Sequence, residues 1–210
     1  TAKYRDSTNL NFTIDHKDSS NYDDDGCIVA SNKGIPYYTK VYLECRVKNG
    51  TLGKDVVGIP IAVGLANSQG PIMSKSFMMP LYHGKQYRYS YKEISDRVPY
   101  EHYIKNMLSP VAMDQEKIIG IGFDLENQSM SIYMDKILMC VIKTDAIKFK
   151  QSNDMMYFII HDVGAFTGTI SCSVNFGETQ FEGVLPEGYM SLWNYYNHFY
   201  PIPIKNCPNI

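Results

Sequence analysis

Short segments of the chain alternate apolar and polar residues with a period of two. Residues 10–14 (Leu-Asn-Phe-Thr-Ile) and 41–47 (Val-Tyr-Leu-Glu-Cys-Arg-Val) follow this pattern, which is typical of strands with one buried face. Residues 59–66 are apolar almost throughout. They predict a strand buried on both faces, with Pro60 at its start, where the missing N–H is tolerated.

The clearest predicted hairpin joins residues 118–125 to residues 129–134. A turn at Asp135-Lys136 then leads into a strand over 137–142, and residues 156–161 and 169–176 supply two more. Helical periodicity is confined to residues 100–108, which predict one short helix or an irregular loop. Many short strands with turns between them predict an all-β fold, an antiparallel β-sandwich with few short helices.

Composition fits one globular domain. The chain has 210 residues, of which 44% are hydrophobic and 20% charged. We expect a single β-sandwich domain over residues 1–193, followed by an aromatic and proline-rich tail over 194–210 that packs on it or serves as a linker. The net charge of -2 gives no general basic surface, so no nucleic acid partner is expected. No apolar run approaches the roughly 18 residues that span a bilayer, so no membrane span is expected.

The five cysteines are scattered, odd in number and free of any CxxC pair. This pattern favours free thiols packed as small apolar side chains over a disulfide framework or a zinc site. We therefore expect a cytoplasmic or other intracellular location, with an extracellular one left open.

Sequence patterns for catalysis and metal binding are missing. The chain has no GxSxG, P-loop or HExxH motif, and Gly120-Ile-Gly122 lacks the third glycine of a dinucleotide site. Residues 21–26 resemble the start of a calcium loop, but Asn32 stands where a bidentate Glu is needed. We expect no enzyme activity, no cofactor and no metal. Asp162 and Glu116 are the residues to test if hydrolysis were found.

Several motifs follow one another in an order that is more specific than composition. They are the aromatic-plus-Glu strand at 41–47, Gly-Leu-Ala at 64–66, the Gly-x-Gly-x-Asp hairpin at 119–135, the strand at 156–160, Asn-Phe-Gly-x-x-x-Phe at 175–181, and Leu-Pro-Glu-Gly-Tyr at 185–189. Together they resemble the SPRY domain family over about residues 10–193. The central stretch 68–117 departs from the family pattern, because a tyrosine-rich segment replaces its glycine-rich one. The resemblance implies a binding sandwich that contacts its ligand through loops at one end and that is commonly one domain of a larger protein.

Residues 82–103 interleave tyrosines with lysines and arginines. This composition is typical of protein-recognition surfaces, whereas alternate tyrosines at 87, 89 and 91 would equally form the core face of a strand. Loops carry most recognition sites. The candidate ligand- or partner-binding residues are Tyr82, Arg97, Tyr100, His102, Tyr103 and Phe166.

These features predict a non-catalytic protein-interaction module that binds a short peptide or a partner protein surface through end loops. The alternative is a carbohydrate-binding β-sandwich on a viral or cell surface, in which tyrosines would stack on sugar rings. The longest predicted connections are residues 67–81 and 91–113, and a short loop over 162–167 carries Phe166. The prediction requires all three to meet at one end of the sandwich.

Overall fold

The structure is a computed structural model. It describes residues 2–4, 11–16, 28–35, 39–49, 56–66, 76–84, 116–143, 156–162, 168–194 and 201–205.

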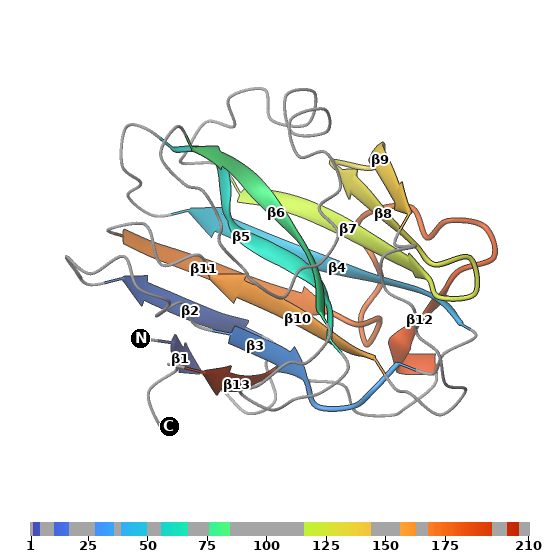
Figure 1. Ribbon diagram of the computed structural model, residues 1–210, viewed down its shortest axis with the longest axis horizontal. Coiled ribbons are helices and arrows are strands. Elements are labelled where there is room, and N and C mark those ends of the chain that lie inside the picture. Colours follow the sequence, from blue (N-terminus) through green and yellow to red (C-terminus); the bar gives the residue numbers. More distant parts are fainter. Residues whose placement is uncertain are drawn as a thin grey trace.

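Two antiparallel sheets form the fold (Figure 1). The eight-stranded sheet has the order β1 (Ala2–Tyr4), β2 (Asn11–His16), β11 (Gly168–Asn175), β4 (Lys40–Asn49), β7 (Glu116–Asp124), β8 (Ser129–Met134) and β9 (Ile137–Lys143), with the short β12 (Met190–Ser191) pairing in parallel with β4. The five-stranded sheet has the order β13 (Pro201–Lys205), β3 (Ile28–Ser31), β10 (Tyr157–Asp162), β5 (Val56–Ala66) and β6 (Ser76–Gly84). This architecture confirms the predicted all-β sandwich.

The core lies between the sheets and follows the period of two. Along β4, the odd-numbered residues Val41, Leu43, Cys45 and Val47 are buried, and the even-numbered residues point to the outer face of the sheet. Phe158 of β10 joins the two sheets, since its ring centroid lies 6.2 Å from that of Phe123 and 6.1 Å from that of Phe176. The alternation seen in the sequence of β4 therefore marks which face of that strand is apolar.

Strand β5 is buried as predicted, but it begins earlier in the sequence than predicted. Ile61, Val63, Gly64 and Leu65 are all buried, so both faces of the strand are covered there. The strand begins at Val56, however, and Pro60 lies inside it. The pairing with β6 shifts register between Gly58 and Ala62, and such an irregularity tolerates a residue without an N–H.

Some elements were not predicted. Residues 76–81 were expected to form part of a loop, but they belong to β6, in which Pro80 and adjacent methionines break any alternation. Within the predicted tail, β13 pairs with β3. The helical element among the described residues is the 3-10 turn η1 (Leu192–Asn194), and no helix there is long and apolar enough to cross a membrane. The short helix expected over 100–108 lies outside the described residues.

Both turns of the β7–β8–β9 meander use left-handed backbone without glycine. Asp135 and Lys136 have φ of 46° and 74°, as a two-residue type I′ turn requires, and Gln128 has φ of 50°. A side chain with a Cβ is strained in this region by about 1 kcal/mol. The left-handed turn at 135–136 twists in the sense that matches the two strands it joins.

Replacing Lys136 with glycine should therefore stabilise the protein. We expect Lys136→Gly to raise the free energy of unfolding by about 1 kcal/mol, because glycine adopts positive φ without the Cβ clash. Urea unfolding measures the change. Lys136→Ala is the matched control, since it removes the same charge but keeps a Cβ. An equal gain in both variants would contradict the backbone explanation.

Asp124 closes the β7–β8 turn. Its carboxylate accepts hydrogen bonds from the backbone N and the Nδ2 of Asn127, at 3.0 Å and 2.8 Å, and pairs with the Nζ of Lys40 at 3.0 Å. Burial would raise the pKa of Asp124, but the hydrogen bonds from Asn127 and Lys40 outweigh it, and the pKa is lowered. The folded protein thus favours the ionised carboxylate.

Stability should accordingly fall in acid through Asp124. A lowered folded pKa contributes stability above the unfolded pKa of about 3.9, and this contribution is lost as the pH falls through the folded pKa. We expect Asp124→Asn to cost about 2 kcal/mol at pH 6, and the difference from wild type to shrink steadily below about pH 4. Urea unfolding at several pH values checks this. A difference that does not change with pH would show that the charge of Asp124 has no part in it.

Candidate functional site

The strand registers show which connections leave from the same end of the sandwich. Gly84 at the end of β6 pairs with Val56, and Asp162 at the end of β10 pairs with Ile61 of the same strand. In the other sheet, Glu116 at the start of β7 pairs with Lys48 near the end of β4. These strand ends, together with Gly168 at the start of β11, lie toward the left in Figure 1 and are called the loop end here.

Two of the three connections expected to form the binding surface leave from the loop end. Residues 85–115 run from the end of β6 to the start of β7, and residues 163–167 run from β10 to β11. The third connection, residues 67–75, joins Ala66 to Ser76 at the opposite end of the second sheet. The expectation that all three meet is therefore wrong for residues 67–75. They join the antiparallel neighbours β5 and β6 at one end of the pair, so the connection that follows β6 leaves from the other end.

The predicted site residues divide accordingly. Tyr82 lies in β6 opposite Gly58, two residues before the strand ends at the loop end. The remaining candidates, Arg97, Tyr100, His102, Tyr103 and Phe166, lie outside the described residues. They belong to the segments 85–115 and 163–167, which follow the ends of β6 and β10 and precede the starts of β7 and β11 at the loop end.

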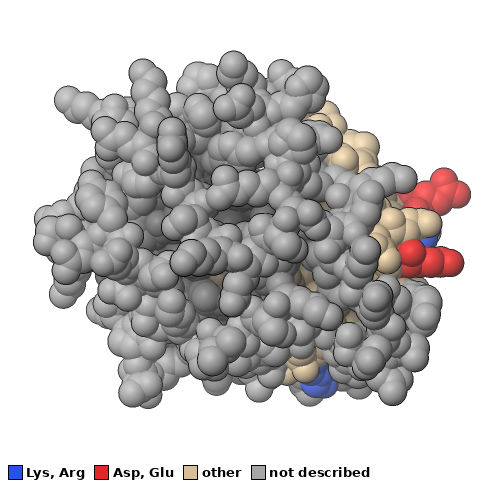
Figure 2. Space-filling view, in the orientation of Figure 1, with Lys and Arg blue, Asp and Glu red and all other residues tan. Residues whose placement is uncertain are grey.

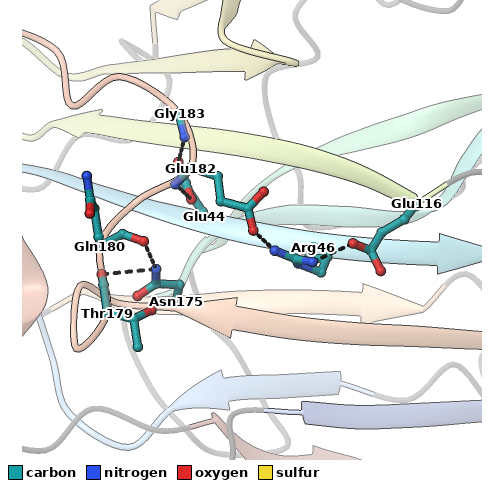
Figure 3. Close-up of polar contacts among 8 residues, drawn as sticks. All are labelled: Glu44, Arg46, Glu116, Asn175, Thr179, Gln180, Glu182 and Gly183. Carbon is teal, nitrogen blue, oxygen red and sulfur yellow. Dashed lines mark hydrogen bonds and ion pairs between the residues drawn. The ribbon is translucent and has the colours of Figure 1, made fainter.

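On the outer face of the eight-stranded sheet, a polar cluster attaches the segment that follows β11. We call residues 176–193 the closing segment. Its first and last residues lie side by side, because the Trp193 N–H donates to the Phe176 carbonyl at 3.0 Å. Glu44 of β4 is 4% exposed. Its carboxylate accepts from the backbone N–H groups of Glu182 at 2.9 Å and Gly183 at 2.7 Å (Figure 3). A buried charge is thus satisfied by backbone 138 and 139 residues away.

Arg46 extends this cluster to the next strand. Its guanidinium pairs with the carboxylate of Glu116 at 2.6 Å and with that of Glu182, so that β4, β7 and the closing segment are linked by ion pairs (Figure 3). All three side chains are more than two-fifths exposed, and water screens such pairs. The buried Glu44 therefore contributes more to holding the segment than the exposed pairs do.

Tyr42 lies across the sheet beneath the closing segment. It is 1% exposed, donates to Glu44 at 3.2 Å, and packs edge-on against Tyr133 and Phe181 at centroid distances of 5.8 Å and 5.0 Å. Gly120 makes room for it, since a Cβ there would overlap the Tyr42 hydroxyl and lie 2.8 Å from Cζ. Gly122 likewise makes room for Tyr189, whose Cε1 would be 2.9 Å from a Cβ. The glycines of the Gly-x-Gly strand thus create space for two tyrosine rings.

The closing segment starts with a turn built by side chains. The Oδ1 of Asn175 accepts from the Gly177 N–H at 2.8 Å. Figure 3 shows its Nδ2 donating to the carbonyls of Thr179 and Gln180. Gly177 has φ of 106°, which is open only to glycine without strain. The Asn-Phe-Gly sequence therefore forms an Asx turn that redirects the chain onto the outer face.

Burial shifts the pKa values of the two acidic groups in this cluster. Burial raises the pKa of Glu44, and the opposing hydrogen bonds from Gly183 and Tyr42 do not fully compensate. Burial and the neighbouring Glu44 carboxylate also raise the pKa of Tyr42. The lone pairs of Glu44 that face inward are occupied by backbone N–H groups and by Tyr42. Glu44 is held as an attachment point and not as a free acid or base.

The residues named for a possible hydrolytic activity lie at the loop end. Glu116 is exposed and paired with Arg46. Asp162 ends β10, and its backbone pairs with Ile61. Within the described part of the chain, no group of three or more His, Cys, Asp or Glu side chains is arranged to bind a metal ion.

Sequence reasoning missed the Glu44 cluster. Its signal was available: a Glu flanked by Tyr42 and Arg46 on the outward-facing positions of a strand whose inward positions are all apolar. A carboxylate buried at this position needs a hydrogen-bond donor from another part of the chain. The sequence pattern of the strand does not say which segment supplies that donor.

The comparisons with known proteins give only distant likenesses. No family model matches the sequence, and no curated protein matches it either. One similar solved structure is the binding domain of botulinum neurotoxin DC in complex with rat synaptotagmin II, with 11% identity and a TM-score of 0.38 over 83% of this chain. Another is alginate lyase AlyC3 in complex with dimannuronate, with 9% identity and a TM-score of 0.32 over 85% of this chain. The chain spans 40% of the first structure and 70% of the second.

Proposed function

We propose that this chain is a non-catalytic protein-interaction module of the SPRY type that binds a short peptide or a partner protein surface at the loop end. The observation that carries the proposal is the convergence of strand ends there. Gly84, Glu116, Asp162 and Gly168 flank the two segments that contain Arg97, Tyr100, His102, Tyr103 and Phe166. A sandwich whose strands at one end flank a tyrosine- and arginine-rich segment, residues 85–115, and a short segment with Phe166, residues 163–167, is suited to recognition.

The roles of the motif residues support this proposal. Gly120, Gly122, Asn175 and Gly177 create space for tyrosine rings or form a turn, and Glu44 attaches the closing segment. Because these residues build the sandwich, we assign binding to the segments that depart from the SPRY pattern. The divergent central stretch 68–117 supplies most of the proposed contacts.

Selection against two ligand classes tests the proposal. The full chain is presented to a random peptide display library and, in parallel, to a glycan array. We expect peptides to be enriched and their binding to be lost when Arg97 and Tyr100 are both replaced by alanine. Binding to glycans, with no peptide enriched, would instead support the carbohydrate-binding alternative and would overturn the proposal.

A further inference from the structure

Exposed large apolar side chains among the described residues come from two segments. They are Ile137 at 66%, Leu138 at 49% and Val141 at 47% in β9, and Val184 at 67%, Leu185 at 40% and Met190 at 38% in the closing segment. Single exposed apolar residues are ordinary, but a group of three on one short strand is unusual. Figure 2 shows uncharged side chains of described residues reaching the surface along the right-hand side, where Figure 1 places β9 and the closing segment.

Strand β9 ends the eight-stranded sheet. It pairs with β8 on one side, and no described strand pairs with its other side. Proteins commonly protect such an edge with charged residues or proline, because its free N–H and C=O groups can pair with another chain. Residues 137–142 read Ile-Leu-Met-Cys-Val-Ile and contain neither. The strand does contain one irregularity in its pairing with β8: the register shifts, and Met139 has no opposite residue in β8.

Charges flank this apolar edge at both ends. Lys136 precedes β9 and Lys143 ends it, whereas Asp135 is already paired with Lys117 at 2.9 Å. If β9 paired antiparallel with β9 of a second copy over its length, Lys143 of each copy would lie within one residue of Lys136 of the other. Like charges at neighbouring cross-strand positions are destabilising. An incoming strand with acidic residues at its ends would instead be attracted.

We propose that the free edge of β9 binds an extended peptide of a partner protein as an added β-strand, with apolar residues at alternate positions and acidic residues at its ends. Backbone hydrogen bonds would supply affinity, and side chains packing on Leu138 and Val141 would supply selectivity. This surface is separate from the loop end, so it goes beyond the function proposed above and does not depend on it.

The test uses a defined peptide pool and the full chain. The pool has Val, Ile, Leu or Phe at alternate positions, Thr between them, and either Asp and Glu or Lys and Arg at the ends. We expect acidic-ended peptides to be enriched about tenfold over basic-ended ones. The best peptide is then made in two forms, each N-methylated at one of the two alternating sets of backbone nitrogens. One form should lose binding and the other keep it, since an added strand turns only one set toward β9.

Matched variants locate the contact. Val141→Lys should weaken peptide binding at least tenfold, whereas Val184→Lys, an equal change at an exposed residue outside the strand, should leave it unchanged. Circular dichroism checks that both variants fold. The proposal is overturned if no peptide is enriched, if both methylated forms bind equally, or if Val141→Lys has no effect. A dimer detected by light scattering and dissociated by Val141→Lys would assign the edge to a second copy and would also overturn it.

Discussion

Replacing Glu44 with alanine should lower the free energy of unfolding by about 2–3 kcal/mol. The substitution removes the acceptor for the backbone N–H groups of Glu182 and Gly183 and for the buried Tyr42 hydroxyl. Hydrogen bonds to a charged group contribute about 1.5–3 kcal/mol each, and relief of the buried charge returns part of that loss. Urea unfolding measures the change, and amide exchange over the closing segment should become faster.

Two further variants separate the buried acceptor from the surface charges. Glu44→Gln keeps one acceptor oxygen, so its cost should lie between those of wild type and Glu44→Ala. Glu116→Ala removes an exposed carboxylate from the neighbouring strand and from the same Arg46, and should cost less than about 1 kcal/mol. If Glu44→Ala were no more harmful than Glu116→Ala, the closing segment would not be held by Glu44.

Adding a single methyl group at Gly120 should be comparably harmful, at about 2–3 kcal/mol for Gly120→Ala. The new Cβ would overlap the Tyr42 hydroxyl and lie 2.8 Å from Cζ and 2.9 Å from Cε2. The ring has no free space to move into, because Tyr133 and Phe181 pack against it and the side chain is 1% exposed. Chemical denaturation of the purified variant measures the loss.

A double-mutant cycle with Tyr42→Phe identifies the cause. Removing the hydroxyl relieves the closest clash, so Gly120→Ala should cost less in the Tyr42→Phe background than in wild type. Equal costs in both backgrounds would mean that Gly120 matters for the backbone of β7 and not for the space it leaves to Tyr42.

The strands were predictable because burial on one face imposes a period of two. Residues 41–47 and 129–134 show this alternation and lie in β4 and β8. Strand β6 was missed because Met78, Met79 and Pro80 interrupt the pattern, and its pairing with β5 comes from the tertiary fold. The roles of the motif glycines depend on tyrosine rings from other strands, which local sequence does not specify.

The candidate site was predictable only in part. Periodicity located the strands, and the registers then placed the ends of β6 and β10 together with the starts of β7 and β11. Residues 67–75 lie at the opposite end because they join the antiparallel strands β5 and β6. Sequence patterns do not give the order and direction of strands in a sheet, so this placement was not predictable. The partner of Glu44 was not predictable either, since the contact joins residues 138 positions apart.

The most direct test of the proposed binding module is the affinity of a library-selected peptide for alanine variants at the loop end. Arg97→Ala, Tyr100→Ala and Phe166→Ala should each weaken binding by more than about 1 kcal/mol, which is more than fivefold, while circular dichroism shows an intact β-fold. Val184→Ala, exposed and remote from these segments in sequence, serves as the control. Unchanged affinity in the three folded variants would contradict binding at the loop end, and so would variants that unfold, since these side chains would then belong to the core.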